Sequence, residues 1–320
     1  MAKLTLHNAG MHTLLQDIGR LGVADAGLSQ GGAADLHSFC WANYLLANPT
    51  SASQLEIVFG QLEVSSDDDI YCVLTGADCR ATIGSEPIKA WQTFVLPKGE
   101  RLKLGYPRAG LRTYFAVQGG FDVPMVKGSC STVVRNQIGG LVQGQPLVNG
   151  DVLLSHTVPS SLPYTVSTPN RFIPDYAQPC ILRVYESYQA SQFSAQAYAK
   201  LYQSTFILSA HSDRMGCRLK GESIIDNKVN ADGRDSKLGT LISEGIAYGA
   251  IQITPDGLPI VMMNDRQTLG GYPKMGCVAR KDMAKLAQSP PGTPIMFQRG
   301  DMTELSKSWW QFSRFFGLPI

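Results

Sequence analysis

The sequence lacks several features that would assign a function directly. Only 17% of its 320 residues are charged and the formal net charge is +2, whereas an average domain is about 25% charged. A nearly neutral chain offers no basic surface of the kind that nucleic acid requires, so nucleic acid is not an expected partner. No run of about 18 apolar residues occurs, so a membrane span is not expected either.

Metal and redox motifs are also missing. The seven Cys are widely spaced and include no C-x-x-C pair, which argues against a zinc ribbon or a thioredoxin-type centre. No H-E-x-x-H string occurs among the five His. The residues before Asp17 contain no apolar run of signal-peptide length. These observations predict a cytoplasmic protein with reduced thiols, and they leave any metal ligands unknown.

The sequence was compared with two motifs, the Walker A nucleotide-binding loop and the G-x-S-x-G nucleophile elbow. The sequence contains no Gly-Lys dipeptide, so a Walker A loop is absent. A G-x-S-x-G string surrounds Ser29, but a nucleophile elbow needs a buried strand before the serine and a helix directly after it. The preceding Gly22–Ala26 segment is small and polar. A glycine-rich binding loop is therefore favoured over a catalytic serine.

Short β-like runs dominate the chain and are separated by turn residues, which is typical of β-barrels and sandwiches. The expected strands cover Lys3–His7, Leu55–Phe59, Ile70–Thr75, Cys79–Ile83, Thr93–Leu96, Arg101–Leu104, Leu111–Val117, Ile181–Tyr185, Thr205–Ser209, Ala250–Thr254, Ile260–Met263 and Ile295–Gln298. Strands and helices do not alternate regularly, so a doubly wound fold is disfavoured.

A few short helices complete the pattern. Asp35 is placed to cap a helix that ends near Asn48-Pro49, because proline restrains the residue before it. Further helices are expected at Gln189–Tyr202, Lys281–Gln288 and Met302–Phe316, the last with aromatic residues at helical spacing. A proline-rich stretch suggests a linker. The sequence therefore predicts a β-rich domain over 1–160, a linker over 161–180 and a second domain over 181–320.

Four segments combine glycine with polar or charged residues, as loops around small ligands do. They are Gln16–Asp35, Gly119–Thr132, Ser212–Leu219 and Ser243–Tyr272. Repeated glycine and Asp-Arg neighbours are also common in ordinary tight turns. Composition alone therefore does not assign a reaction to them.

The motifs within these segments resemble a known family. Gln16-Asp-Ile-Gly-Arg20, Gly128-Ser-Cys-Ser-Thr132, Ser212-Asp-Arg-Met-Gly-Cys-Arg-Leu219 and Asp265-Arg-Gln-Thr-Leu-Gly-Gly-Tyr-Pro273 look like the KipA-like family. This family is also called allophanate hydrolase subunit 2, or carboxyltransferase subdomain B. The resemblance runs from about Leu4 to Phe297 and implies a mainly β chain of two cyclophilin-like β-barrel domains with a few short helices. One departure is Leu269, where the family usually has Thr.

Two branches share this module, and a third possibility is a regulator. A free-standing chain of this length is commonly the C subunit of an ATP-dependent 5-oxoprolinase, which opens 5-oxo-L-proline to L-glutamate together with the A and B subunits, one of them KipI-like. The implied co-substrate is ATP, with Mg²⁺. The alternatives are half of a biotin-dependent carboxyltransferase of the urea carboxylase type, and a non-catalytic KipA-like regulator. Biotin is implied only under the carboxyltransferase alternative.

The resemblance also implies roles for individual residues. Activation of a lactam by phosphoryl transfer needs positive charge and well-placed hydrogen bonds. The expected catalytic residues are Asp265, Glu244 and Arg214. The expected substrate-binding residues are Arg20, Asp213, Arg218, Gln252, Gln267, Thr268, Gly270, Gly271 and Tyr272.

Overall fold

The computed structural model describes residues 1–156, 165–225 and 242–319, and the chain divides into two compact units. Unit 1 comprises Met1–Leu21, Gly31–Ala177 and Phe316–Pro319. Unit 2 comprises Gly22–Gln30 and Gln178–Phe315. A short N-terminal segment of the chain therefore belongs to unit 2, although the residues on both sides of it belong to unit 1. The end of the predicted first domain, 157–160, and the start of the predicted linker, 161–164, lie outside the described residues.

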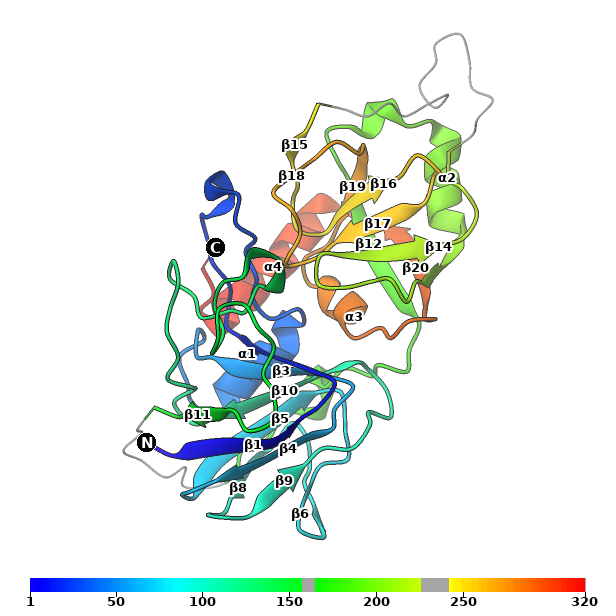
Figure 1. Cartoon of the computed structure of the whole chain (residues 1–320). Coiled ribbons are helices and arrows are strands. Elements are labelled where there is room, and N and C mark those ends of the chain that lie inside the picture. Colours follow the sequence, from blue (N-terminus) through cyan, green and yellow to red (C-terminus); the bar gives the residue numbers. More distant parts are fainter. Residues whose placement is uncertain (157–164, 226–241, 320) are drawn as a thin grey trace. The chain divides into compact units, whose positions relative to one another are not determined.

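Unit 1 consists of two antiparallel sheets (Figure 1). One has the order β11-β1-β4-β9-β6-β7 and the other the order β2-β3-β10-β5-β8. Their bounds are β1 (Lys3–Ala9), β2 (His12–Gln16), β3 (Gln54–Val58), β4 (Leu62–Ser66), β5 (Ile70–Gly76), β6 (Thr82–Ile83), β7 (Glu86–Pro87), β8 (Thr93–Leu96), β9 (Arg101–Lys103), β10 (Arg112–Val117) and β11 (Val152–Leu154).

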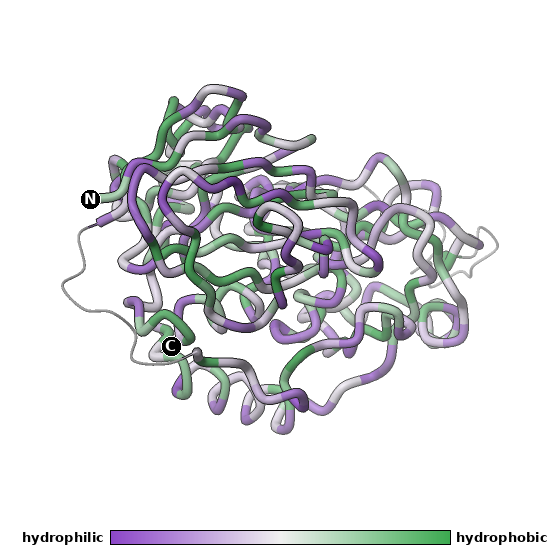
Figure 2. Tube along the Cα trace, turned by 90° about the horizontal axis from the view of Figure 1, so that it is seen from below, coloured by the Kyte–Doolittle hydropathy of each residue, from purple (hydrophilic) through white to green (hydrophobic). Residues whose placement is uncertain are grey.

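Side chains from both sheets form one apolar core in unit 1. Leu4 and Leu6 of β1 meet Leu55 and Ile57 of β3 in this core, and all four are fully buried. Alternate residues of β1 are buried, as expected for a strand with one face on a core. Hydrophobic and hydrophilic residues are accordingly interspersed along the chain (Figure 2).

Helix α1 (Leu36–Leu45) lies in unit 1 and begins where the sequence predicts. Asp35 is its N-cap and accepts a hydrogen bond from the backbone N–H of Ser38 at 3.0 Å. The helix ends three residues before the predicted stop at Asn48-Pro49, because Ala47 adopts a left-handed φ of 53°. Two short 3₁₀ turns complete unit 1, η2 (Val134–Asn136) and η3 (Asn170–Phe172).

Unit 2 is built on a closed barrel with the order β12-β19-β16-β17-β14-β13-β20. The parallel pairing of β12 with β20 closes it, and the other pairs are antiparallel. The bounds are β12 (Cys180–Glu186), β13 (Thr205–Leu208), β14 (Gly216–Lys220), β16 (Ala250–Ile253), β17 (Pro259–Met262), β19 (Lys274–Val278) and β20 (Pro294–Arg299).

The remaining elements of unit 2 include a small two-stranded sheet and three helices. The sheet pairs β15 (Glu244–Gly245) with β18 (Leu269–Gly270). The helices are α2 (Ala195–Gln203), α3 (Met283–Ala287) and α4 (Met302–Phe316), and the 3₁₀ turns are η1 (Ala24–Ala26) and η4 (Ala190–Gln192). The last residue of α4, Phe316, is assigned to unit 1. No helix within the described ranges is long and apolar enough to cross a membrane.

The prediction of a mainly β chain with a few short helices is confirmed, and unit 2 contains a closed barrel. Three local predictions are wrong. The Cys79–Ile83 strand is reduced to β6, and the Gln189–Tyr202 helix begins only at Ala195, where Ser194 caps it. Residues 216–219, expected to form a loop, belong to β14.

Candidate functional site

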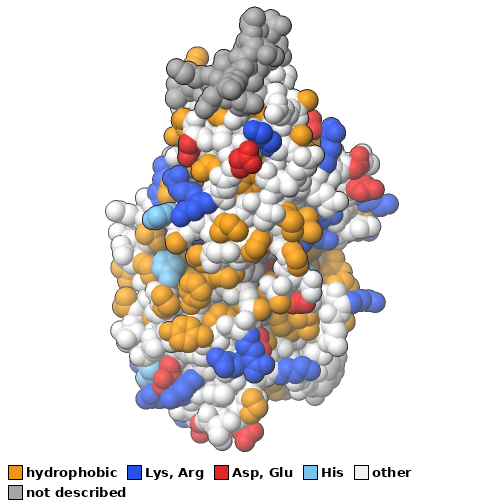
Figure 3. Space-filling model, turned by 90° about the vertical axis from the view of Figure 1, so that its right-hand side faces the viewer, with side chains coloured by type: hydrophobic (Ala, Val, Ile, Leu, Met, Phe, Trp, Pro, Cys, Tyr) orange, Lys and Arg blue, Asp and Glu red, His pale blue; other side chains and the backbone are white. Residues whose placement is uncertain are grey.

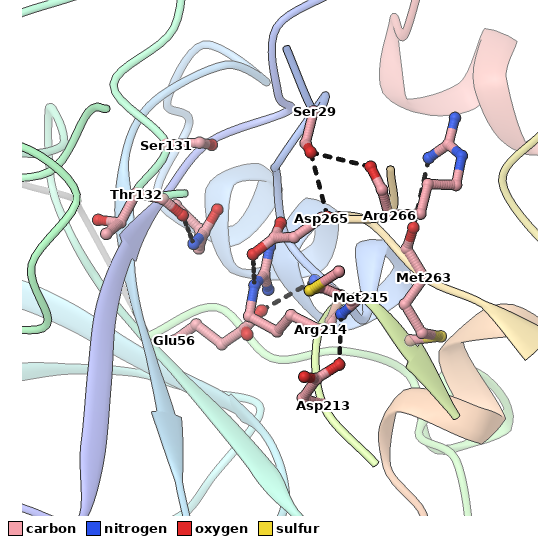
Figure 4. A network of polar contacts seen from close by, with 12 residues as sticks. Ser29, Glu56, Ser131, Thr132, Asp213, Arg214, Met215, Met263, Asp265 and Arg266 are labelled. Carbon is pink, nitrogen blue, oxygen red and sulfur yellow. Dashed lines mark hydrogen bonds and ion pairs between the residues drawn. The ribbon is translucent and has the colours of Figure 1, made fainter. Parts of the chain in front are cut away.

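Arg214 and Asp265 form a buried, two-pronged ion pair in unit 2. Arg214 donates from Nε to Oδ2 of Asp265 at 2.9 Å and from Nη2 to Oδ1 at 3.0 Å (Figure 4). Their side chains are 8% and 5% exposed. The backbone N–H of Asp265 also donates to the carbonyl of Arg214 at 2.7 Å. The pair thus ties the turn before β14 to the turn after β17.

Ser29 supports the second of these turns. Its hydroxyl lies 3.1 Å from the carbonyl oxygen of Asp265 and 2.8 Å from that of Arg266, and it donates to these oxygens. A hydroxyl directed at carbonyl groups is not activated by a base, as a nucleophile must be. Ser29 therefore anchors the short Gly22–Gln30 segment to the Asp265 turn.

Glu244 forms the centre of a second polar cluster. Its Oε1 accepts from Nζ of Lys274 at 3.1 Å and from the side-chain amide of Gln189. Its Oε2 accepts from the Tyr188 hydroxyl at 2.6 Å. The hydrogen bond from Tyr188, followed by that from Lys274, lowers the pKa of Glu244, because both stabilise the carboxylate. The same bond raises the pKa of Tyr188 to about 12.

Lys274 is the unusual member of this cluster. Its side chain is only 4% exposed, whereas that of Glu244 is 33% exposed. Its backbone N–H donates to Oε1 of Gln189 at 2.6 Å, so Gln189 is hydrogen-bonded to both residues of the ion pair. An almost fully buried ammonium group needs a counter-charge, and Glu244 supplies it. Lys274 directly follows the glycine-rich motif that ends at Pro273, and no signal in the sequence singled it out.

Gln252 lies beside Lys274 on the barrel. The two residues are cross-strand partners of β16 and β19, so their side chains lie on the same face. Gln252 is 2% exposed, and its Nε2 has no hydrogen-bond partner among the described residues. Gly270 lies against it: a Cβ at Gly270 would lie 3.1 Å from Nε2 of Gln252 and 3.0 Å from Nε2 of Gln267.

The β15–β18 sheet brings these groups together. Glu244 and Gly270 are cross-strand partners in it, so the carboxylate that holds Lys274 and the glycine that touches Gln252 share one small element. Figure 1 shows β15 and β18 beside β16 and β19. Of the predicted site residues, the structure therefore unites Glu244, Gln252, Gln267 and Gly270.

Other predicted residues of unit 2 have different surroundings. Asp213 is exposed, and its Oδ1 accepts from the backbone N–H groups of Met215 and Gly216, at 2.7 and 3.1 Å. Arg218 is an exposed residue of β14, and Tyr272 is 37% exposed. Asp213 thus has the geometry of a turn residue, and Arg218 and Tyr272 have that of surface side chains.

Thr268, Leu269 and Gly271 lie in or beside β18. Thr268 pairs through its backbone carbonyl with the N–H of Ile246 at 3.0 Å. Gly271 follows β18 directly and is partly buried. Leu269, the residue that departs from the family pattern, is 59% exposed. A side chain at this position is therefore largely in contact with solvent.

Arg20 belongs to unit 1 and is 1% exposed. Its Nε donates to the carbonyl of Val126 at 2.9 Å and its Nη2 to that of Ser129 at 3.1 Å. The neighbouring Asp17 accepts from the hydroxyls of Ser129 and Ser131, both at 2.6 Å. Two of the glycine-rich segments are thus joined to each other by buried hydrogen bonds.

The carboxylates are poorly suited to hold a metal ion. Asp265 is bound by Arg214 and Glu244 by Lys274, so each already has a cation as its partner. Over residues 1–156, 165–225 and 242–319, no group of three or more His, Cys, Asp and Glu is arranged to ligate a metal. We therefore assign no metal-binding role to these residues.

The fold and the motifs together define the class of protein. The chain belongs to the family of the carboxyltransferase domain, subdomains A and B, whose model matches residues 26–299. It is 37% identical to the C subunit of 5-oxoprolinase from Escherichia coli, over 98% of this chain and 96% of that protein. It is 31% identical to the corresponding 5-oxoprolinase component of Haemophilus influenzae, over 92% of this chain and 90% of that one.

A solved structure shares the fold. The Kluyveromyces lactis urea carboxylase superposes with a TM-score of 0.87 at 24% identity, over 97% of this chain and 29% of the carboxylase chain. At this identity the likeness is one of fold. The family resemblance that the sequence motifs indicated is thus confirmed.

Proposed function

We propose that this chain is the C-type subunit of an ATP-dependent 5-oxoprolinase, which opens 5-oxo-L-proline to L-glutamate together with partner subunits. The observation that carries the proposal is the 37% identity to the Escherichia coli protein along nearly the full length of both chains. The name of that protein makes it one part of a larger enzyme, and the same part is the expected role here.

The chemistry explains why such an enzyme needs several components. A lactam carbonyl is a poor electrophile because of amide resonance, and phosphoryl transfer from ATP supplies the activation that lets water attack its carbon. The Glu244 cluster is suited to holding the substrate, because it places hydrogen-bonding groups beside apolar side chains. These side chains form the buried cluster of Ile246, Ala250, Ile260 and Met262. We assign ATP and Mg²⁺ to the assembled enzyme without naming the component that holds them.

Partner subunits need a docking surface, and unit 2 has apolar side chains that reach the solvent. Trp310 and Phe315 of α4 are 45% and 53% exposed. Figure 3 shows hydrophobic side chains at the surface among charged ones. Scattered apolar residues are normal on any protein, so the partner assignment rests on the relatives.

The test is reconstitution. The chain is purified alone, and also with the products of neighbouring genes that resemble the A and B subunits, and glutamate release from 5-oxoproline is followed with and without ATP. We expect ATP-dependent release only from the complete mixture. Strong turnover by the isolated chain would contradict the proposed role as one component of a larger enzyme.

Two other outcomes would identify the alternative functions. Carboxyl transfer that requires a biotinylated partner would place the chain in the carboxyltransferase branch. Stable binding to a partner without any turnover of 5-oxoproline or urea would identify a regulator. Each outcome replaces the proposed function by a different one.

A further inference from the structure

In the cluster around Glu244, the acceptor atoms are occupied by hydrogen bonds, whereas some donor groups are not. Both carboxylate oxygens are occupied, one by Lys274 and Gln189 and the other by Tyr188. The side-chain oxygen of Gln189 accepts from the backbone of Lys274. The acceptors of the cluster are therefore engaged by groups of the protein itself.

Hydrogen-bond donors of Lys274 and Gln252 lie on the same face of the barrel. The ammonium group of Lys274 has three N–H bonds, and Glu244 is its partner in the cluster. The Nε2 of Gln252 has two more, is buried, and has no partner among the residues the structure describes. Leaving a buried polar group without a hydrogen bond costs about 1–3 kcal/mol. A ligand that brings acceptor oxygens would remove that cost.

The surroundings restrict the shape of such a ligand. Gln252 is the cross-strand partner of Ile260 as well as of Lys274, because β16 lies between β17 and β19. Ile260 belongs to the apolar cluster with Ile246, Ala250 and Met262. Donors thus lie beside aliphatic side chains, an arrangement that suits a small ring with a carbonyl on one edge and CH₂ groups on the other.

We propose that Lys274 and Gln252 form a carbonyl-recognition site, in which the oxygen of a cyclic amide accepts hydrogen bonds from the Lys274 ammonium and the Gln252 carboxamide. This inference deepens the proposed function and rests on it for the identity of the amide, 5-oxoproline. Glu244 and Gln189 are positioning residues, since they hold Lys274 in place. Because Gly270 has no side chain, the backbone can lie close to the carboxamides of Gln252 and Gln267.

Binding is measured by calorimetry with 5-oxoproline as the probe, on the full chain and on the reconstituted complex. Cyclopentanecarboxylate is the matched control ligand, because it keeps a neutral five-membered ring and the carboxylate but lacks the ring amide. We expect 5-oxoproline to bind at least tenfold more tightly than cyclopentanecarboxylate. Equal affinities, or no binding of 5-oxoproline to either sample, would overturn the proposal.

Variants locate the site. Gln252→Leu keeps the approximate size of the side chain and removes the donors, and it should weaken 5-oxoproline binding about tenfold, which corresponds to roughly 1.4 kcal/mol. Lys274→Met should weaken it further, and Lys200→Met, in which a partly exposed lysine next to Glu222 is changed, is the control. If Lys274→Met is unstable, Lys274→Met combined with Glu244→Gln removes both charges together. Unchanged binding in all of the site variants would contradict the inference.

Further outcomes distinguish a failure of the proposed function from a failure of this inference. In the active complex, Gln252→Leu should raise KM for 5-oxoproline and leave KM for ATP unchanged. A complex that releases glutamate with the same KM for 5-oxoproline in wild type and variant keeps the function and loses the site. A chain that binds 5-oxoproline through Gln252, in a complex without ATP-dependent glutamate release, keeps the site and loses the function.

Discussion

Two of the ion pairs in unit 2, Arg214–Asp265 and Lys274–Glu244, differ in the number of hydrogen bonds that join their side chains. Arg214 and Asp265 meet through two parallel hydrogen bonds, and both side chains are less than a tenth exposed. Lys274 and Glu244 meet through one contact, with the lysine buried and the carboxylate one-third exposed. Arg214 thus binds both oxygens of Asp265, whereas the Lys274 ammonium binds only one oxygen of Glu244.

This difference separates a structural pair from a binding pair. Two-pronged arginine–carboxylate pairing fixes geometry and consumes the hydrogen-bonding capacity of the carboxylate. A lysine with one carboxylate partner keeps donors that a ligand can use. The family motif contains Asp265, yet the geometry favours the neighbouring Lys274 for substrate contact. Four changes test this distinction.

Asp265→Ala should have the largest effect. It leaves the Arg214 guanidinium buried without its carboxylate, and removal of one partner of a buried pair typically costs about 3–5 kcal/mol. Chemical denaturation of the full chain measures the loss, with Asp256→Ala, at an exposed position, as the control. A variant of normal stability whose complex no longer releases glutamate would instead support the catalytic role that the family motif implies for Asp265.

Arg214→Lys should have the next largest effect. The charge is kept, but lysine cannot form both parallel hydrogen bonds, and a hydrogen bond to a charged group is worth about 1.5–3 kcal/mol. We expect a loss of unfolding free energy in that range, with KM for 5-oxoproline unchanged in the complex. A changed KM without a loss of stability would assign Arg214 to the substrate site.

Glu244→Gln should have a smaller effect that depends on pH. The pKa of Glu244 is lowered in the folded chain, so its ionised form stabilises the fold at pH values above the ordinary glutamate pKa of about 4.3. That contribution disappears as the pH falls through the lowered pKa. The denaturation midpoints of wild type and variant should therefore differ at pH 7 and converge as the pH falls below the lowered pKa of Glu244. A constant difference would contradict the assignment.

Tyr188→Phe should have the smallest effect on stability, because Tyr188 is 73% exposed. It removes the hydrogen bond that contributes most to lowering the pKa of Glu244. Titration of the Glu244 carboxylate by NMR should show its pKa moving up toward the ordinary value. No movement would mean that Lys274 alone sets the charge state of this carboxylate.

Local signals in the sequence predict the elements that they control. Asp35 caps α1, and the aromatic spacing of the last helix predicts Met302–Phe316 as observed. The strand β19 escapes prediction because Lys274 and Gly276 are poor strand formers. Gly276 is required there, since a Cβ would lie 2.6 Å from Cγ1 of Val184. That constraint comes from β12, far earlier in the chain, and has no local signature.

The same limit applies to the site. Glycine-rich motifs predict Glu244, Gln252, Gln267 and Gly270, which the structure brings together. Lys274 looks like a surface residue in the sequence, because its burial depends on a carboxylate 30 positions away. Arg218 matches the motif, yet the alternation of β14 directs it to solvent. The motifs thus predict the segments that form the candidate site. The cross-strand register decides which of their side chains lie on the proposed ligand-binding face.

The parallel pairing of β12 with β20 has a consequence for biosynthesis. Cys180 pairs with Ile295, so the barrel of unit 2 cannot close until the ribosome has released nearly all of these 320 residues. Until then a nascent chain exposes the free edges of β12 and β13, which are sites of non-native strand pairing. Non-local closure of this kind slows folding. Truncation before β20 should accordingly yield aggregates in the cell, whereas loss of the residues after α4 leaves the barrel strands complete.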